Sequence, residues 1–81
     1  MNNILVISSY DNGYMFTVQY GKYRVQNDYY DIADDELLNI CYKYMSNDKN
    51  LIEKLKEINI NPDYIIICID GTINVISVPR P

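Results

Sequence analysis

Two short dipeptides, each lying between runs of β-branched residues, constrain this chain more than any other feature. Asn12-Gly13 follows "NILVISSY", and Asp70-Gly71 separates "DYIIICI" from "TINVISV". Asn-Gly and Asp-Gly accept the positive φ angles of two-residue hairpin turns, and apolar, β-branched runs on both sides are typical of paired strands. The sequence therefore predicts two tight β-hairpins, one near each end.

The middle of the sequence changes from strand to helix character. Gly21-Lys22 suits a type II′ turn, so we expect "YRVQN" to form a third strand. Apolar residues then recur with helical spacing over residues 32–46, and a second such stripe runs over residues 51–58, with Asn47 or Asp48 as a helix cap between them. The predicted fold class is α+β in the order β-β-β-α-α-β-β, with a five-stranded mainly antiparallel sheet packed on two helices.

Two-residue turns fix the register of each hairpin, so the facing residues follow from the sequence. The first hairpin should pair Ser9 with Phe16 and Ile7 with Val18, and the next turn should pair Tyr20 with Tyr23 and Val18 with Val25. The second hairpin should pair Cys68 with Ile73, Ile66 with Val75, Tyr64 with Ser77, Ile69 with Thr72, Ile67 with Asn74 and Ile65 with Ile76. The core face of the first three strands is expected to carry Leu5, Ile7, Phe16, Val18, Tyr20, Tyr23 and Val25.

The second hairpin is apolar on both of its faces. If both helices cover one side of the sheet, the other side exposes a contiguous apolar patch, which monomers seldom do. We therefore expect a homodimer that packs sheet against sheet. Its predicted interface residues are Ile4, Val6, Ile65, Ile67, Ile69 and Ile76. The alternative is that one helix crosses to the back of the sheet and covers it.

Size and charge limit the class of protein. The 81 residues suit a single domain, 1–81, with 11 acidic and seven basic residues and a net charge of −4. No basic run could neutralise phosphates, so direct binding to nucleic acid is disfavoured. The start "MNNILVISSY" does not have the features of a signal peptide, and no membrane span is expected. Cys41 and Cys68 lie far apart in apolar segments, as buried thiols of a cytoplasmic, intracellular protein do.

Several catalytic chemistries have no support in the sequence. There is no histidine, which removes the commonest general base and metal ligand. Neither cysteine has flanking basic residues that would activate it. All three glycines are accounted for by predicted turns, so no phosphate-binding loop and no cofactor are expected. Asp70-Gly71-Thr72 also has no lysine where a PD…(D/E)xK nuclease pattern requires one.

The segment "DYYDIADDE", residues 28–36, concentrates five carboxylates and two tyrosines. Asp31 or Asp34 can cap the helix that follows, and acids in a first helical turn interact favourably with the helix dipole. The functional interpretation is a negative surface that engages a basic groove on a partner, with tyrosines contributing binding energy. The predicted partner-binding residues are Asp28, Tyr29, Tyr30, Asp31 and Asp35.

The function predicted on these grounds is protein–protein interaction without catalysis. Small size and a bias toward Ile, Asn, Tyr and Lys are typical of compact accessory proteins of viruses and mobile elements. We expect an accessory or inhibitory protein that binds a host protein, such as a nucleic-acid-binding enzyme. One alternative is a metal-dependent nuclease or other small hydrolase that holds Mg²⁺ with Asp31, Asp34, Asp35 and Glu36. The other is a structural subunit whose apolar sheet face builds a homo-oligomer.

Overall fold

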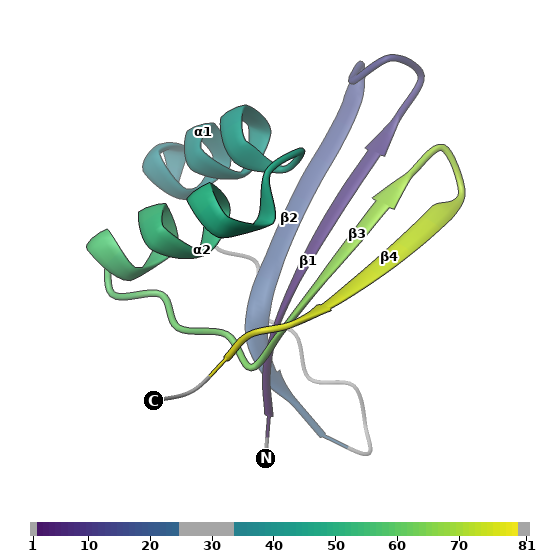
Figure 1. The fold of residues 1–81 in the computed structure, drawn as a ribbon. Coiled ribbons are helices and arrows are strands. Elements are labelled where there is room, and N and C mark those ends of the chain that lie inside the picture. The colour runs from purple at the N-terminus through teal and green to yellow at the C-terminus, as the bar shows by residue number, and fades with distance from the viewer. Residues whose placement is uncertain (1, 25–33, 80–81) are drawn as a thin grey trace.

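Six regular elements make up the part of the chain that the computed structural model describes, which is residues 2–24 and 34–79 (Figure 1). They are β1 (Asn2–Tyr10), β2 (Met15–Tyr23), α1 (Asp35–Tyr44), α2 (Asp48–Glu57), β3 (Tyr64–Ile69) and β4 (Thr72–Ser77). The class is α+β, as predicted. The sheet, however, has four strands among the described residues, in the order β2-β1-β3-β4, and not the five that we expected.

The first hairpin turns at the predicted dipeptide. Asp11, Asn12 and Gly13 all have positive φ angles, and the Tyr14 amide donates to the carbonyl oxygen of Asp11 at 3.0 Å. Asn, Asp and Gly tolerate this left-handed backbone better than other residues do, which is why the chain reverses here. The predicted pairs Ser9 with Phe16 and Ile7 with Val18 are both present.

The prediction of a second turn at Gly21-Lys22 is wrong. β2 runs straight through both residues to Tyr23, and Gly21 pairs with Ile4. Because β1 begins almost at the N-terminus, it offers hydrogen-bonding partners along the whole of β2, and the ladder continues where we expected a reversal. Tyr20 and Tyr23 are therefore in one strand and do not face each other. Val25, with the rest of the expected third strand, lies outside the described residues.

The second hairpin has the predicted turn and the predicted register. Asp70 and Gly71 both have positive φ angles. All six predicted pairs are present: Cys68 with Ile73, Ile66 with Val75, Tyr64 with Ser77, Ile69 with Thr72, Ile67 with Asn74 and Ile65 with Ile76.

The two hairpins meet along β1 and β3, which run parallel, so the sheet is mixed and the expectation of a mainly antiparallel sheet is corrected. Parallel neighbours need a long crossover connection, and the two helices supply it. Hydrogen bonds fix both ends of this contact. The Asn3 amide donates to a carboxylate oxygen of Asp63 at 2.8 Å, and the Asp70 amide donates to the carbonyl oxygen of Ser9 at 2.9 Å.

Both helices begin at a polar cap. The Asp34 carboxylate accepts from the amides of Glu36 at 2.8 Å and Leu37 at 3.3 Å, and the Asn47 side chain accepts from the Asn50 amide at 3.3 Å. These side chains satisfy amides that have no partner within the first helical turn. Within the described residues, neither helix combines the length and apolarity that crossing a membrane requires.

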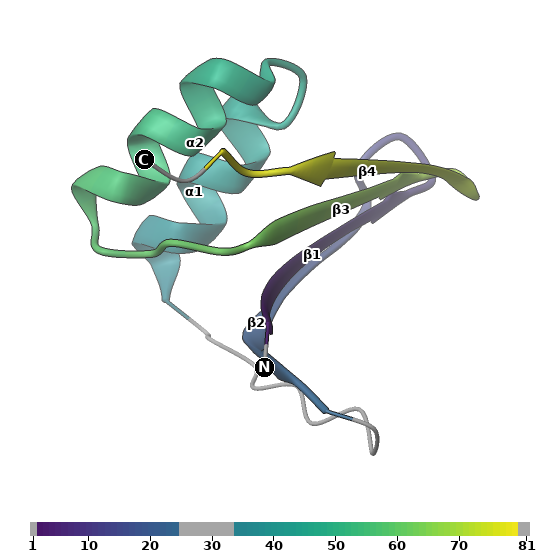
Figure 2. The same cartoon turned by 60° about the horizontal axis from the view of Figure 1, so that its bottom comes forward.

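Both helices cover the same face of the sheet and leave the other face open (Figure 2). The alternative that one helix crosses to the back of the sheet is therefore wrong. From the helices, Leu37, Cys41, Leu51 and Leu55 enter the core. The sheet contributes Leu5, Ile7, Val18, Ile65 and Ile67, and Val78 closes the core at one end. Of the other predicted core residues, Phe16 and Tyr20 are partly buried, whereas Tyr23 is 42% exposed.

Candidate interaction surface

The open face of the sheet is built by the alternation of side chains along paired strands. Residues opposite each other in a ladder point to the same side of the sheet, so the registers place Ile4 and Val6 of β1 beside Tyr64 and Ile66 of β3. The β4 partners of Ile66 and Cys68 lie on the same side. We call this surface the open-face patch, and it consists of Ile4, Val6, Tyr64, Ile66, Cys68, Ile73 and Val75.

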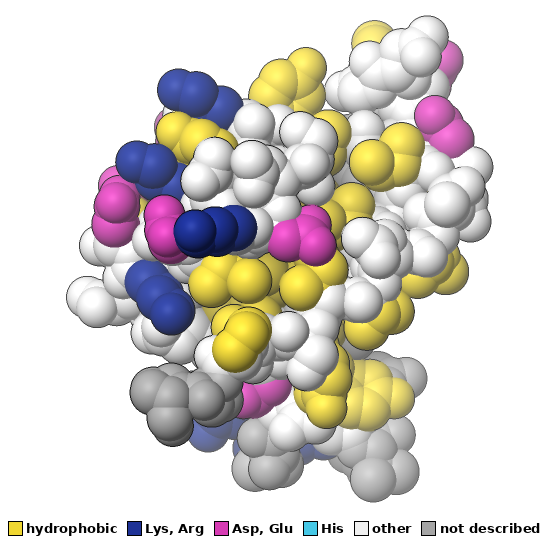
Figure 3. Space-filling view, viewed as in Figure 1, with side chains coloured by type: hydrophobic (Ala, Val, Ile, Leu, Met, Phe, Trp, Pro, Cys, Tyr) yellow, Lys and Arg dark blue, Asp and Glu magenta, His cyan; other side chains and the backbone are white. Residues whose placement is uncertain are grey.

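No charged side chain belongs to the open face among the strand residues that the structure describes. Beyond the patch, the described strand residues on this face are all uncharged. They are Asn2, Ser8, Tyr10, Met15, Thr17, Gln19, Gly21, Tyr23 and Ser77. Charged residues make up 22% of the chain. Figure 3, in which the helices lie toward the viewer, shows charged side chains gathered over the helix side of the molecule.

Side-chain exposure in the patch increases from its partly buried centre on β3 to the exposed side chains of β4. Ile66 is its centre, with Val6 beside it on β1 and Val75 beside it on β4. Val75 is 58% exposed and Ile73 is 65% exposed, whereas Ile66 is partly buried by its neighbours. Large apolar side chains at this exposure on neighbouring positions of one face form a candidate surface for contact with another molecule.

The six residues predicted as an oligomer interface do not share a face. Ile4 and Val6 lie in the open-face patch, but Ile65 and Ile67 are 0% and 4% exposed beneath the helices. Ile69 and Ile76 belong to that same helix-covered side, by alternation along β3 and by pairing of Ile76 with Ile65. The parallel register of β1 and β3 decides this, because it places Leu5 beside Ile65 and Ile7 beside Ile67. The register within each hairpin was predicted correctly. The predicted interface, however, combined the open side of the first hairpin with the helix-covered side of the second.

The predicted acidic-tyrosine surface falls largely outside the described residues. Asp28, Tyr29, Tyr30 and Asp31 lie in residues 25–33. Asp35 is exposed as the first residue of α1. Among the acids that follow this segment, Asp34 has the capping role that the sequence predicts for it or for Asp31.

Groups able to do chemistry do not converge in the described parts of the chain. No group of three Asp, Glu, Cys or His side chains there is arranged to hold a metal ion. Burial raises the pKa of the Cys41 thiol to about 12, so this sulfur stays protonated at neutral pH. Cys68 is the other thiol, and both cysteines are free, as expected. Cys41 is buried, but Cys68 is only partly buried, because it lies in the open-face patch.

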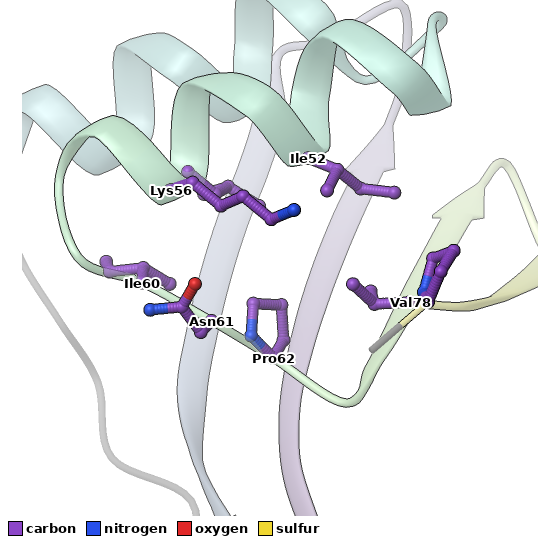
Figure 4. Close-up of a pocket in the computed structure, with 8 residues that line it drawn as sticks. Ile52, Lys56, Ile60, Asn61, Pro62 and Val78 are labelled. Atoms are coloured by element: carbon purple, nitrogen blue, oxygen red, sulfur yellow. The ribbon is translucent and has the colours of Figure 1, made fainter. Parts of the chain in front are cut away.

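A small cavity of about 60 Å³ lies on the helix side, between α2 and the end of the chain (Figure 4). Ile52 and Lys56 approach it from α2, and Val78 approaches it from the segment after β4. Drug-sized ligand pockets occupy roughly 300–1,000 Å³, so this cavity is too small to hold such a ligand.

Comparison of the chain with protein families, characterised proteins and solved structures found no match in any of the three. The assignment of function therefore depends on the surface alone.

Proposed function

We propose that this chain is a non-catalytic protein-interaction module that acts by contact through its open-face patch. The observation that carries the proposal is an apolar sheet face without one charged residue among its described positions. Edge and surface strands that face water ordinarily carry charges, which keep other proteins away. This face has none, and its most exposed large apolar side chains are Ile73, Met15 and Val75.

Covering the patch supplies part of the free energy that specific binding requires. Fully burying an exposed Ile or Val contributes about 1.5–3 kcal/mol, so covering the exposed parts of Ile73, Val75, Val6 and Ile66, which together amount to at most about two side chains, contributes roughly 3–6 kcal/mol. Part of that gain offsets the loss of rotational and translational freedom on association. A micromolar complex needs about 8 kcal/mol net, so a partner must also make favourable contacts with the polar margin of the face.

The biological setting is part of the same proposal. We expect an intracellular protein, because two free thiols suit a reducing compartment. An accessory or inhibitory role, of the kind that compact viral and mobile-element proteins perform by covering a surface of a host protein, fits a module that acts by contact.

The test compares two matched double variants in affinity capture from cells that produce the chain. Ile73→Lys with Val75→Lys places two charges on the open face. Thr72→Lys with Asn74→Lys places the same charges on the same strand but on its other side, and all four positions are exposed. We expect the proteins retained by the unmodified chain, including untagged copies of itself, to be lost with the first pair and kept with the second. Equal retention by both double variants, or no retained protein at all, contradicts the proposal.

A further inference from the structure

The open-face patch requires a covering surface of particular character. The covering surface must be apolar at its centre, because Ile66 lies between Val6 and Val75 with no hydrogen-bonding side chain in that row until Gln19. It must also be free of charge, since a charge buried against this face would have no partner. Another sheet, packed about 10 Å away, is one surface that can cover such a face.

Among the residues that the structure describes, the open face itself meets these conditions. In a two-fold symmetric contact, each residue near the axis meets its own copy. A charged centre would then be repelled by itself, whereas Ile66 against Ile66 carries no such penalty. The chain has a net charge of −4, and sheet-to-sheet packing keeps the acidic residues of the helices of two copies on the outer sides of the assembly.

We propose that the occupant of the open-face patch is a second copy of this chain, packed sheet against sheet about a two-fold axis. This inference rests on the proposed function, whose partner it names. The result is a four-layer arrangement of helices, sheet, sheet and helices. Each sheet then has both faces covered, as expected for central strands that are apolar on both sides.

The size of the face agrees with a stable dimer. Four strands about 4.8 Å apart, with about six residues each rising about 3.3 Å, cover about 20 Å by 20 Å. That footprint is about 800 Å² over two copies, and the three further residues of each of the strands β1 and β2 bring it close to the 1,000 Å² or so that a specific interface needs. β1 and β2, with nine residues each, extend beyond this footprint.

The experiment is a measurement of mass in solution by sedimentation or light scattering, with the full chain. At micromolar concentration we expect twice the 9.5 kDa of one chain. Ile73→Lys with Val75→Lys should give the mass of a single chain, with dimer affinity weakened by roughly 100-fold or more. Thr72→Lys with Asn74→Lys should remain dimeric. A single-chain mass for the unmodified protein at about 100 μM, far above a micromolar dissociation constant, or a dimer that both double variants leave intact, overturns the inference.

A second measurement needs no variant and covers the case in which added charges prevent folding. Cys68 lies in the patch, whereas Cys41 lies in the core. In the dimer, the reaction of Cys68 with a thiol reagent should slow as protein concentration rises through the dissociation constant. A rate for Cys68 that does not change with concentration overturns the inference.

The two proposals fail in distinguishable ways. A monomer that still retains another protein, and loses it with the open-face charges alone, overturns the second copy as occupant and leaves the open-face patch as the interaction surface. A dimer whose mass and captured partners are both insensitive to open-face charges overturns both.

Discussion

The hydroxyl oxygen of Tyr10 lies 3.1 Å from the sulfur of Cys68, which joins the end of β1 to β3 on the open face of the sheet. This hydrogen bond is the main reason that the pKa of Tyr10 is raised above its ordinary value of 10.0. The charge interaction with Cys68, the loss of hydration and the nearby Asp70 raise it further. The neutral phenol is thus favoured in the folded chain.

Replacing Cys68 with alanine should lower the pKa of Tyr10 toward the ordinary tyrosine value. A raised folded-state pKa means that the contribution of Tyr10 to stability is complete below the unfolded value and is lost as pH rises through the folded value. Titration of the Tyr10 ring carbon by NMR measures the shift. Cys41→Ala is the control, and it should leave the Tyr10 curve unchanged. An unaltered curve in Cys68→Ala would contradict the role of this hydrogen bond.

The buried thiol of Cys41 should make the fold sensitive to alkali. The pKa of this thiol is about 12 in the folded chain and 9.0 when it is not buried. As pH rises, the thiol therefore loses its proton in the unfolded chain first. The free energy of unfolding should therefore fall by up to about 1.4 kcal/mol per pH unit between these two values. Denaturant unfolding at pH 8 and pH 10 measures this, as the difference between the unmodified chain and Cys41→Ala. Parallel pH profiles for the two proteins would show that Cys41 does not contribute.

Asp34→Ala should destabilise the fold by about 1 kcal/mol, because the amides of Glu36 and Leu37 lose their acceptor. Asp35→Ala is the matched control, since it removes a neighbouring acid that interacts with the helix dipole but accepts none of these hydrogen bonds. Its effect should be about 0.3–1 kcal/mol. Thermal or denaturant unfolding compares the two. A larger loss in Asp35→Ala than in Asp34→Ala would remove the cap from the explanation.

Ile65 and Ile66 are adjacent in β3 but lie on opposite sides of the sheet, and their alanine variants should differ accordingly. Ile65 is fully buried, so Ile65→Ala should cost about 2–5 kcal/mol of folding stability. Ile66→Ala should cost less in the dissociated chain and should instead weaken self-association. Unfolding at high dilution and mass at high concentration separate these effects. The reverse pattern would mean that β3 presents its other face to the helices.

The acidic-tyrosine segment yields a separate prediction about partner binding. If the negative surface that the sequence predicts binds a second partner with a basic groove, Asp28→Lys with Asp31→Lys should abolish capture of that partner and leave cooperative unfolding intact. Glu53→Lys with Glu57→Lys makes the same charge change on α2 and should keep capture. Unfolding curves and capture assays together test this. Capture that both pairs weaken equally would assign the effect to net charge and not to the segment.

The parts of the fold that were predicted correctly are those fixed by nearby residues. Asn12-Gly13 and Asp70-Gly71 determine two turns. The first turn fixes the predicted pairs of β1 with β2, and the second fixes every pair of β3 with β4. Asp34 and Asn47 act as caps within three residues of the amides that they bind. Local chemistry of this kind is readable from sequence because the interacting groups are close along the chain.

The errors come from contacts between distant segments. Gly21 resembles a turn residue, but pairing with Ile4 holds it in a strand. The side of the sheet on which Ile65 lies depends on whether it pairs beside Ile4 or beside Leu5, and no turn fixes that choice. Four of the six residues predicted for the oligomer interface therefore lie on the helix-covered side of the sheet.

The parallel contact of β1 with β3 also affects how the chain folds. Each hairpin can close within a few residues, but the hydrogen bond from Asn3 to Asp63 joins positions 60 residues apart. Closing so long a loop costs entropy before any contact is gained, and such contacts slow folding. We expect the hairpins and helices to form early and this contact to form late, so that the folding rate responds most to substitutions along β1 and β3.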